Sequence, residues 1–308
     1  MINLRREICV RYNNLSGYLR EKYSSRLKKI CIDGHFSCPN RDGTCGHGGC
    51  IYCGERGAGE HIDPGQDIEN QVRAALDGSD GEFIAYFQNF TNTYAPIDVL
   101  RERYDAACID ERIRILSIGT RPDCIDEYIA ALIASYKSER EVWVELGLQT
   151  ASDRTADLIN RGYHQETFER AMEILGRYEI PVVVHLIVGL PGEGLNEIAE
   201  TVEYLGTFNV WGVKIHSIYV MRGTRLAQMY ESGEYTPPTL EEFIDGAVYI
   251  LTHLSKKVVI HRLTGDCPRE LLLAPEWNTD KHRIISEINQ RLESLGLSQG
   301  SLYSENQH

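Results

Sequence analysis

The amino-acid sequence predicts an α/β protein built on an open, partial (β/α)6 barrel with short extensions at both ends. Short runs rich in β-branched residues alternate with segments whose apolar residues recur at helical spacing, from about residue 27 to residue 260. No Ser/Gly-rich linker interrupts this pattern. Because six candidate strands are fewer than the eight of a closed TIM barrel, a TIM-like but incomplete barrel is expected.

Three segments of the 308-residue chain follow from this pattern. Residues 1–26 form a basic N-terminal segment, residues 27–262 the barrel, and residues 263–308 a helical C-terminal extension. The length alone would also allow two domains, but the unbroken alternation favours one.

Each strand is predicted from a short apolar or alternating run. In chain order the six strands cover residues 27–32, 83–88, 113–118, 141–148, 182–188 and 212–220. In such barrels the chemistry is expected in the loops that follow the carboxyl ends of the strands.

Apolar stripes with the 3.6-residue period predict helices that pack one face on the sheet. The stripes consist of Ile125, Tyr128, Ile129, Leu132, Ile133 and Tyr136; of Phe168, Ala171, Met172 and Leu175; of Leu195, Ile198, Val202 and Leu205; and of Leu240, Phe243, Ile244, Ala247, Leu251 and Leu254. A closing helix is expected over residues 279–295.

The charge of the chain limits its partners. A net charge of −13 argues against a protein that coats nucleic acid or an anionic membrane non-specifically. Residues 1–37 nevertheless hold eight basic and three acidic residues, a local charge of +5, which is either a solvated face or one local contact with an anionic partner. Neither a signal sequence nor an apolar run of about 18 residues is present, so a cytoplasmic protein without a membrane partner is expected.

A glycine-rich loop after the first predicted strand contains Cys38, Cys45, Cys50 and Cys53. Three interpretations are open: a structural zinc site using all four thiolates, an iron–sulfur cluster held by three of them, or inert thiols. The loop leaves the carboxyl end of a barrel strand, where catalytic loops lie, and this position favours the cluster.

Polar residues inside predicted strands mark a second candidate region. Alternation places Glu145 and Gln149 on one face of the fourth strand, His185 on the fifth, and Lys214 and His216 on the sixth. Burying such groups is costly unless they meet partners, so their convergence next to the cysteine loop predicts an active site. A satisfied internal network, such as an ion pair between Glu145 and Lys214, is the alternative.

Six ordered motifs resemble one family of proteins. They are HFSCPNRDGTCGHGGCIYC, YFQNFTNTYAP, SIGTRPDC, VELGLQTASDRTADLINRGY, HLIVGLPGE and VKIHSIYVMRGT. Together they resemble the YhcC/YtqA-like radical S-adenosylmethionine (SAM) proteins, which are related to the radical domain of the Elongator catalytic subunit. The resemblance spans about residues 10–295 and implies a radical SAM barrel.

The resemblance implies two cofactors, a [4Fe–4S] cluster and SAM. The cluster ligands map onto Cys38, Cys50 and Cys53, and Cys45 is left over. Reductive cleavage of SAM at the cluster would give a 5′-deoxyadenosyl radical that abstracts hydrogen from the substrate, with a flavodoxin- or ferredoxin-type protein as the low-potential electron donor.

Further roles follow from the resemblance and from the loops after the strands. Contacts to SAM are expected from Tyr52, Gln88, Gln149, Arg161, His185 and Gly189, and catalytic roles from Glu145, Lys214 and His216. Cys108, Cys124 and Cys267 are scattered, so a second cluster for sulfur insertion is not expected.

The substrate implied by the resemblance is tRNA, modified at the C5 side chain of the wobble uridine, and the basic N-terminal segment would suit its backbone. Two alternatives stay open at this stage. One is radical chemistry on a small metabolite, as in the porphyrin-forming oxidases, and the other is a zinc-stabilised binding protein without catalysis.

Overall fold

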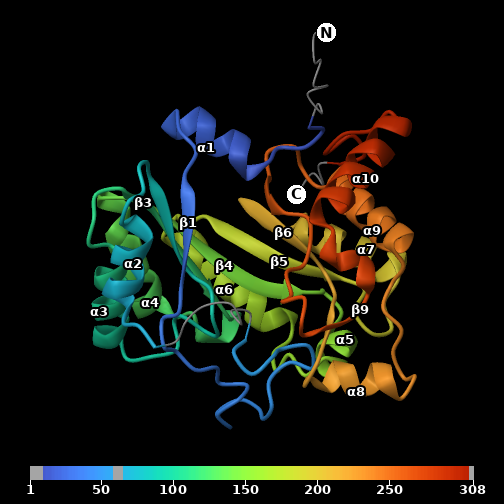
Figure 1. The fold of residues 1–308 in the computed structure, drawn as a ribbon, viewed down its shortest axis with the longest axis horizontal. Helices are drawn as coiled ribbons and strands as arrows, with labels where there is room; N and C mark the ends of the chain where they lie inside the picture. The colour runs from blue at the N-terminus through green and yellow to red at the C-terminus, as the bar shows by residue number, and fades with distance from the viewer. Residues whose placement is uncertain (1–9, 58–64, 305–308) are drawn as a thin grey trace.

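A single curved sheet forms the centre of the computed structural model, which describes residues 10–57 and 65–304, and helices cover the outer face of the sheet (Figure 1). Its seven strands are all parallel and follow one another in chain order, so the sheet winds as an incomplete βα barrel. The strands are β1 (Lys28–Ile32), β2 (Phe83–Phe87), β3 (Ile113–Thr120), β4 (Glu141–Gln149), β5 (Val182–Val188), β6 (Gly212–Ser217) and β8 (Val259–Arg262).

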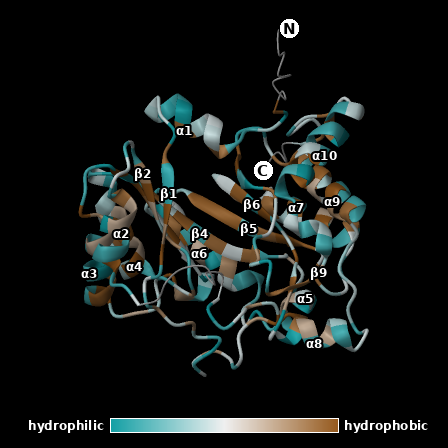
Figure 2. Cartoon of the chain, in the orientation of Figure 1, coloured by the Kyte–Doolittle hydropathy of each residue, from teal (hydrophilic) through white to brown (hydrophobic). Residues whose placement is uncertain are grey.

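Nine α-helices follow β1 in the part of the chain that the structure describes. They are α2 (Ile68–Leu76), α3 (Ile97–Ala107), α4 (Glu127–Ser135), α5 (Asp153–Leu158), α6 (Gln165–Arg177), α7 (Leu195–Leu205), α8 (Arg225–Glu231), α9 (Leu240–His253) and α10 (Lys281–Ser294), with short 3-10 turns at Pro122–Cys124, Tyr136–Ser138 and Glu276–Thr279. Helices α2, α3, α4, α6, α7 and α9 pack buried residues into the core on the outer face of the sheet, α10 packs on α9, and α8 packs in a second cluster away from that face. Several begin at a side-chain cap that accepts a backbone N–H, for example Asp67 before α2 and Thr239 before α9. In Figure 2 the strands β4 and β5 are coloured apolar, whereas much of the surface of the helices is polar.

The parallel α/β fold and the closing helix are confirmed, but the strand count is corrected. The sheet contains a seventh strand, β8, which the sequence analysis missed because only two apolar residues precede His261 and Arg262 in it. The strand predicted over residues 212–220 is divided: β6 ends at Ser217, and β7 (Val220–Met221) pairs antiparallel with β9 (Leu272–Ala274). The C-terminal extension is therefore not purely helical.

The prediction that Tyr128 and Leu195 belong to the buried faces of their helices is wrong. The side chains of Tyr128 and Leu195 are 81% and 51% exposed, respectively. Both lie in the first turn of their helices, which begin at Glu127 and Leu195, so the later turns supply the buried face.

The amino ends of the strands are closed by helix α1 (Leu15–Tyr23). Its Leu19 packs in a buried cluster with Trp143 and Val183 of the sheet, and the ring of Tyr18 lies edge-on to Trp143 and Trp211. Figure 1 shows α1 at one end of the sheet and the loop after β1 at the other. The barrel is thus plugged at its floor, and the cysteine loop lies at its open end.

The floor also holds part of the basic N-terminal segment predicted over residues 1–26. Lys22 forms an ion pair of 2.8 Å with Glu141, the first residue of β4, and so lies at the floor, far from the cysteine loop. Arg5 and Arg6 of the predicted segment lie outside the described residues. Within the part of the chain that the structure describes, no helix is both long and apolar enough to cross a membrane.

Candidate functional site

A cavity of about 290 Å³ opens at the carboxyl ends of the strands and joins the two regions singled out in the sequence. The predicted site residues on its wall are Cys38, Cys50, Tyr52, Cys53, Gln88, Glu145, Gln149, His185, Lys214 and His216. Arg161 and Gly189 are not on this wall. The loop after β1 and the polar face of β4, β5 and β6 therefore belong to one site.

Three of the four loop cysteines share this cavity. Cys38, Cys50 and Cys53 line it, whereas Cys45 is exposed and lies off the wall. A hydrogen bond with Cys53 lowers the pKa of the Cys50 thiol to about 6. The donor set, three thiols around a cavity with a fourth outside it, fits a three-cysteine cluster.

The loop is held in shape by Arg41. The guanidinium donates hydrogen bonds to the carbonyls of Gly54 and Glu55, at 2.5 and 2.7 Å, just after Cys53. Gly49 has a φ of +76°, and a Cβ there would lie 2.8 Å from the Nε of Arg41. Only glycine therefore lets the chain turn past this side chain directly before Cys50.

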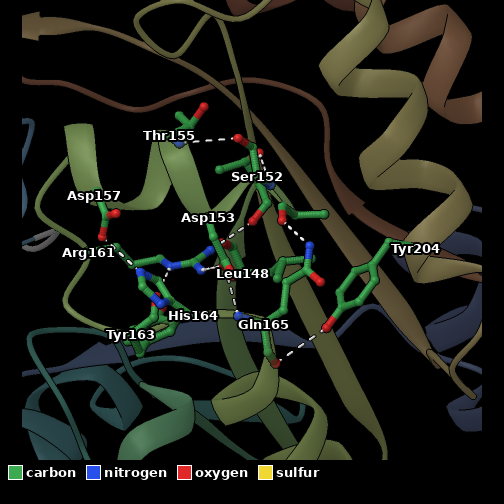
Figure 3. Close-up of polar contacts among 12 residues, drawn as sticks. Leu148, Ser152, Asp153, Thr155, Asp157, Arg161, Tyr163, His164, Gln165 and Tyr204 are labelled. Carbon is green, nitrogen blue, oxygen red and sulfur yellow. Dashed lines mark hydrogen bonds and ion pairs between the residues drawn. The ribbon is translucent and has the colours of Figure 1, made fainter.

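Arg161 is buried beside the loop after β4 and off the cavity wall, and Figure 3 shows its polar contacts. Its guanidinium is 1% exposed and donates to the carbonyls of Leu148, Thr150 and Tyr163, with Asp153 at 3.6 Å. The Nη2 of Arg161 is buried and has no hydrogen-bond partner among the described residues. The bonds that the guanidinium does make fix the loop after β4, and a contact of Arg161 with SAM stays a prediction.

Gly189 lies off the cavity wall. Its φ is +98°, and a Cβ there would lie 2.6 Å from Pro238. The carbonyl of Gly189 accepts a hydrogen bond of 2.7 Å from the hydroxyl of Tyr235. Packing against this neighbouring segment therefore requires glycine at this position, and a contact of Gly189 with SAM stays a prediction.

The polar centre of the cavity is Glu145, which is 1% exposed. Its carboxylate is ion-paired with Lys214 and accepts hydrogen bonds of 2.8 Å from both His185 and Ser117. The Nζ of Lys214 also lies 3.2 Å from the hydroxyl of Tyr86. Side chains from five strands, β2 to β6, thus meet inside the barrel.

Burial dominates the acid–base properties of this centre. It lowers the pKa of Lys214 to about 7, although the charge of Glu145 opposes the shift. Burial also lowers the pKa of His185 and of His216. For Glu145 burial acts in the upward direction, but the charge of Lys214 and the hydrogen bond from His185 outweigh it and hold the pKa well below its usual range.

Gln149 reaches the cavity through an irregularity at the end of β4. The pairing register shifts between Gly147 and Gln149, and the φ of Gln149 is +68°. A Cβ on Gly147 would lie 2.7 Å from the Nε2 of Gln149 and 3.2 Å from the hydroxyl of Tyr163. Simple alternation predicted the correct face, but the glycine and the bulge are what make room for the side chain.

Several cavity residues were missed by the sequence analysis. The cationic and aromatic ones are Lys29, Arg41, Tyr86, Phe90, Arg121, Tyr163, Tyr219 and Arg262. The alternation of Lys29 and Cys31 in β1 was a usable signal, because both lie on the cavity wall. Arg262 carried no such signal, since its strand was not recognised.

Comparison with known proteins places this site in a family. The Radical SAM superfamily model matches residues 43–205, and the Radical_SAM C-terminal domain model matches residues 210–294. Protein YtqA of Bacillus subtilis is 36% identical over 301 residues, which cover 95% of this chain and 93% of that protein.

Two further similarities are more distant. The tRNA uridine(34) acetyltransferase of Methanocaldococcus jannaschii is 27% identical over 220 residues, covering 68% of this chain and 37% of that protein. The structure of Methanocaldococcus infernus Elp3 superposes with a TM-score of 0.67 at 20% identity, over 89% of this chain and 64% of that chain, and so shares the fold. The chain belongs to the radical SAM superfamily, and the protein is an enzyme whose cofactors are a [4Fe–4S] cluster and SAM.

Proposed function

We propose that this radical SAM enzyme modifies the wobble uridine of tRNA by hydrogen abstraction at the C5 side chain, with Cys38, Cys50 and Cys53 as cluster ligands. The observation that carries the proposal is the single cavity that these three thiols share with the polar centre at Glu145. The tRNA substrate is supported by the similarity to a tRNA uridine(34) acetyltransferase.

The cofactors, when bound, supply a carbon-centred radical that removes one hydrogen atom from the substrate. The protein has to hold the substrate next to that radical and keep water out. The cavity walls suit the second task, because Tyr52, Phe90, Tyr163, Ile187 and Ile218 provide apolar surface around the polar centre.

Within the polar centre, Lys214 is the residue best placed to bind and orient an acceptor group of the substrate or to exchange a proton with it. A lysine whose pKa lies at about 7 is present in both protonation states at neutral pH. Glu145 orients the Lys214 ammonium, and Ser117 and His185 in turn orient Glu145. Gln88 and Gln149 offer amide groups on the wall of the cavity for polar parts of a bound molecule.

The test uses anaerobically reconstituted protein with SAM, dithionite and tRNA from a strain that lacks the corresponding gene. Formation of 5′-deoxyadenosine that depends on tRNA, together with a mass change confined to the wobble nucleoside, is the expected result. C50A serves as the control that cannot assemble the proposed cluster. Formation of 5′-deoxyadenosine with no change in any tRNA nucleoside would exclude the tRNA substrate.

A small metabolite is the second candidate, and one observation favours it. The basic N-terminal helix lies at the floor of the barrel, opposite the cavity, and therefore supplies no phosphate contacts near the site. Binding of tRNA at two salt concentrations separates the candidates, because phosphate contacts make the affinity fall steeply with salt. Undetectable binding at low salt would favour the small metabolite.

A further inference from the structure

A clamp of hydrogen bonds joins the cysteine loop to the segment Ile159–Gly162. The backbone N–H of Ile51 donates to the carbonyl of Ile159 at 3.0 Å, and the side chain of Asn160 donates to the carbonyls of His47 and Gly49 at 3.1 and 2.8 Å. Asn160 has a φ of +52°, a conformation that asparagine tolerates better than most residues. The clamp fixes the backbone directly before Cys50.

Asn40 is the buried centre of this clamp, with a side chain only 1% exposed. Its Nδ2 donates to the carbonyl of Asn160 at 2.6 Å and lies 3.9 Å from the Sγ of Cys50, within range of an N–H···S hydrogen bond. A second carbonyl, that of Arg161, lies 3.4 Å from the same nitrogen. Because a flipped amide would set its oxygen against these two carbonyls, the N–H group is the one that faces the thiol.

The other end of the Asn40 amide is held between two glycines. A Cβ on Gly46 would lie 2.2 Å from the Asn40 Oδ1, and one on Gly162 would lie 3.0 Å from it. Within the described part of the chain, this Oδ1 is buried and has no hydrogen-bond partner. The oxygen therefore contributes no bond of its own, and the bonds that Asn40 does make are those of its N–H group.

We infer that Asn40 is a positioning residue that raises the reduction potential of the cluster by hydrogen bonding to the Cys50 thiolate. Hydrogen bonds to ligand sulfurs are among the factors that set the potential of iron–sulfur clusters. A donor next to the thiolate stabilises the additional negative charge when a reductant transfers one electron to the cluster. This inference rests on the proposed role of Cys50 as a ligand.

The experiment compares the parent protein, N40A and N160G, each reconstituted anaerobically, without SAM or substrate. Iron and sulfide per chain are measured first, and the midpoint potential is then obtained by a dithionite titration followed by electron paramagnetic resonance. N160G removes the two side-chain bonds of Asn160 but keeps Asn40, and glycine accepts the left-handed backbone.

The expected result is that N40A retains the cluster but is harder to reduce. At a fixed solution potential, the ratio of reduced to oxidised cluster should fall by about threefold, which corresponds to a shift of about 28 mV for a one-electron couple. N160G should keep the parent potential. An equal shift in both variants would trace the effect to movement of the loop and would overturn the inference.

Two other outcomes would overturn the proposed effect of Asn40 on the reduction potential. An unchanged potential in N40A at full iron content would show that the hydrogen bond has no redox effect, and loss of iron from N40A would leave Asn40 only a structural role. Thermal unfolding of the cluster-free protein reports whether N40A still folds. C50A is reconstituted in parallel, because a full iron content in that variant would refute the ligand assignment itself, whatever Asn40 does.

Discussion

Strand β4 carries two carboxylates four residues apart, Glu141 and Glu145, and their surroundings differ. Glu141 accepts hydrogen bonds of 2.6 Å from the hydroxyls of both Tyr18 and Tyr23, and it forms an ion pair with Lys22. These three partners belong to helix α1, and the Nε1 of Trp143 donates a further hydrogen bond of 2.7 Å, so this carboxylate fastens the floor.

Glu145 has partners from the sheet itself and faces the cavity. Lys214, His185 and Ser117 come from β6, β5 and β3, and each of these strands leads at its carboxyl end into the loops around the site. The comparison teaches that burial and a lysine partner do not by themselves identify a functional carboxylate. What distinguishes Glu145 is the open space beside it and the thiols on the same wall.

The largest effect is expected at the open end of the barrel. C50A should lose nearly all of its iron and all SAM cleavage, because a three-cysteine site cannot spare a ligand. C45A is the matched control and should load iron like the parent, since Cys45 is exposed and off the cavity wall. Iron and sulfide analysis with visible absorption checks both variants. Loss of iron from C45A would reassign the ligands.

Substitution of Glu145 comes next. At pH 6, where Lys214 still carries its proton, E145Q leaves the Lys214 charge buried without its partner, so the free energy of unfolding should fall by about 3–5 kcal/mol. Substrate-dependent turnover should also fall by about 100-fold or more if the pair is catalytic. The double variant E145Q/K214M removes both charges and should regain most of the stability but none of the turnover.

That double variant separates the two interpretations of the polar centre, a catalytic pair and a purely structural network. Denaturant unfolding gives the stability, and formation of 5′-deoxyadenosine and of modified substrate gives the activity. Parent-like turnover in a stable double variant would show that Glu145 and Lys214 are a structural network, as Glu141 is.

A smaller effect is expected at the floor. E141Q should lower the free energy of unfolding by about 1–3 kcal/mol, because the new amide group faces hydroxyl and ammonium donors. Turnover per folded molecule, measured well below the unfolding temperature, should match the parent. A loss of turnover as large as that of E145Q would erase the contrast between the two carboxylates.

The smallest effect is a pH dependence of the stability, which should come from Lys214 beside Glu145 and not from Glu141. The pKa of Lys214 is lowered from the ordinary lysine value of 10.5 to about 7, so between these values the unfolded chain holds a proton that the folded protein lacks. Stability should therefore rise with pH above 7, by about 1 kcal/mol per pH unit. K214M should flatten this rise in urea unfolding between pH 7 and 9, whereas E141Q should keep it.

The sequence by itself determined the class of fold and the family. The alternation of strand and helix patterns requires a parallel α/β sheet, and the alternation within single strands placed Glu145, His185 and Lys214 on the inner face. The spacing of the cysteines and the motifs around them led to the radical SAM resemblance. All of these signals are local, because they depend on a residue and its near neighbours along the chain.

Only the tertiary structure decided which residues meet. Cys45 lies in the same loop as its three neighbours, yet only folding shows it outside the cavity. The family resemblance implied a cofactor contact for Arg161, and only the structure shows that its guanidinium is buried and donates to three backbone carbonyls. The basic N-terminal helix lies at the floor because its apolar residues plug the barrel. In each case the outcome depends on contacts between segments far apart in the chain, and no short-range pattern contains that information.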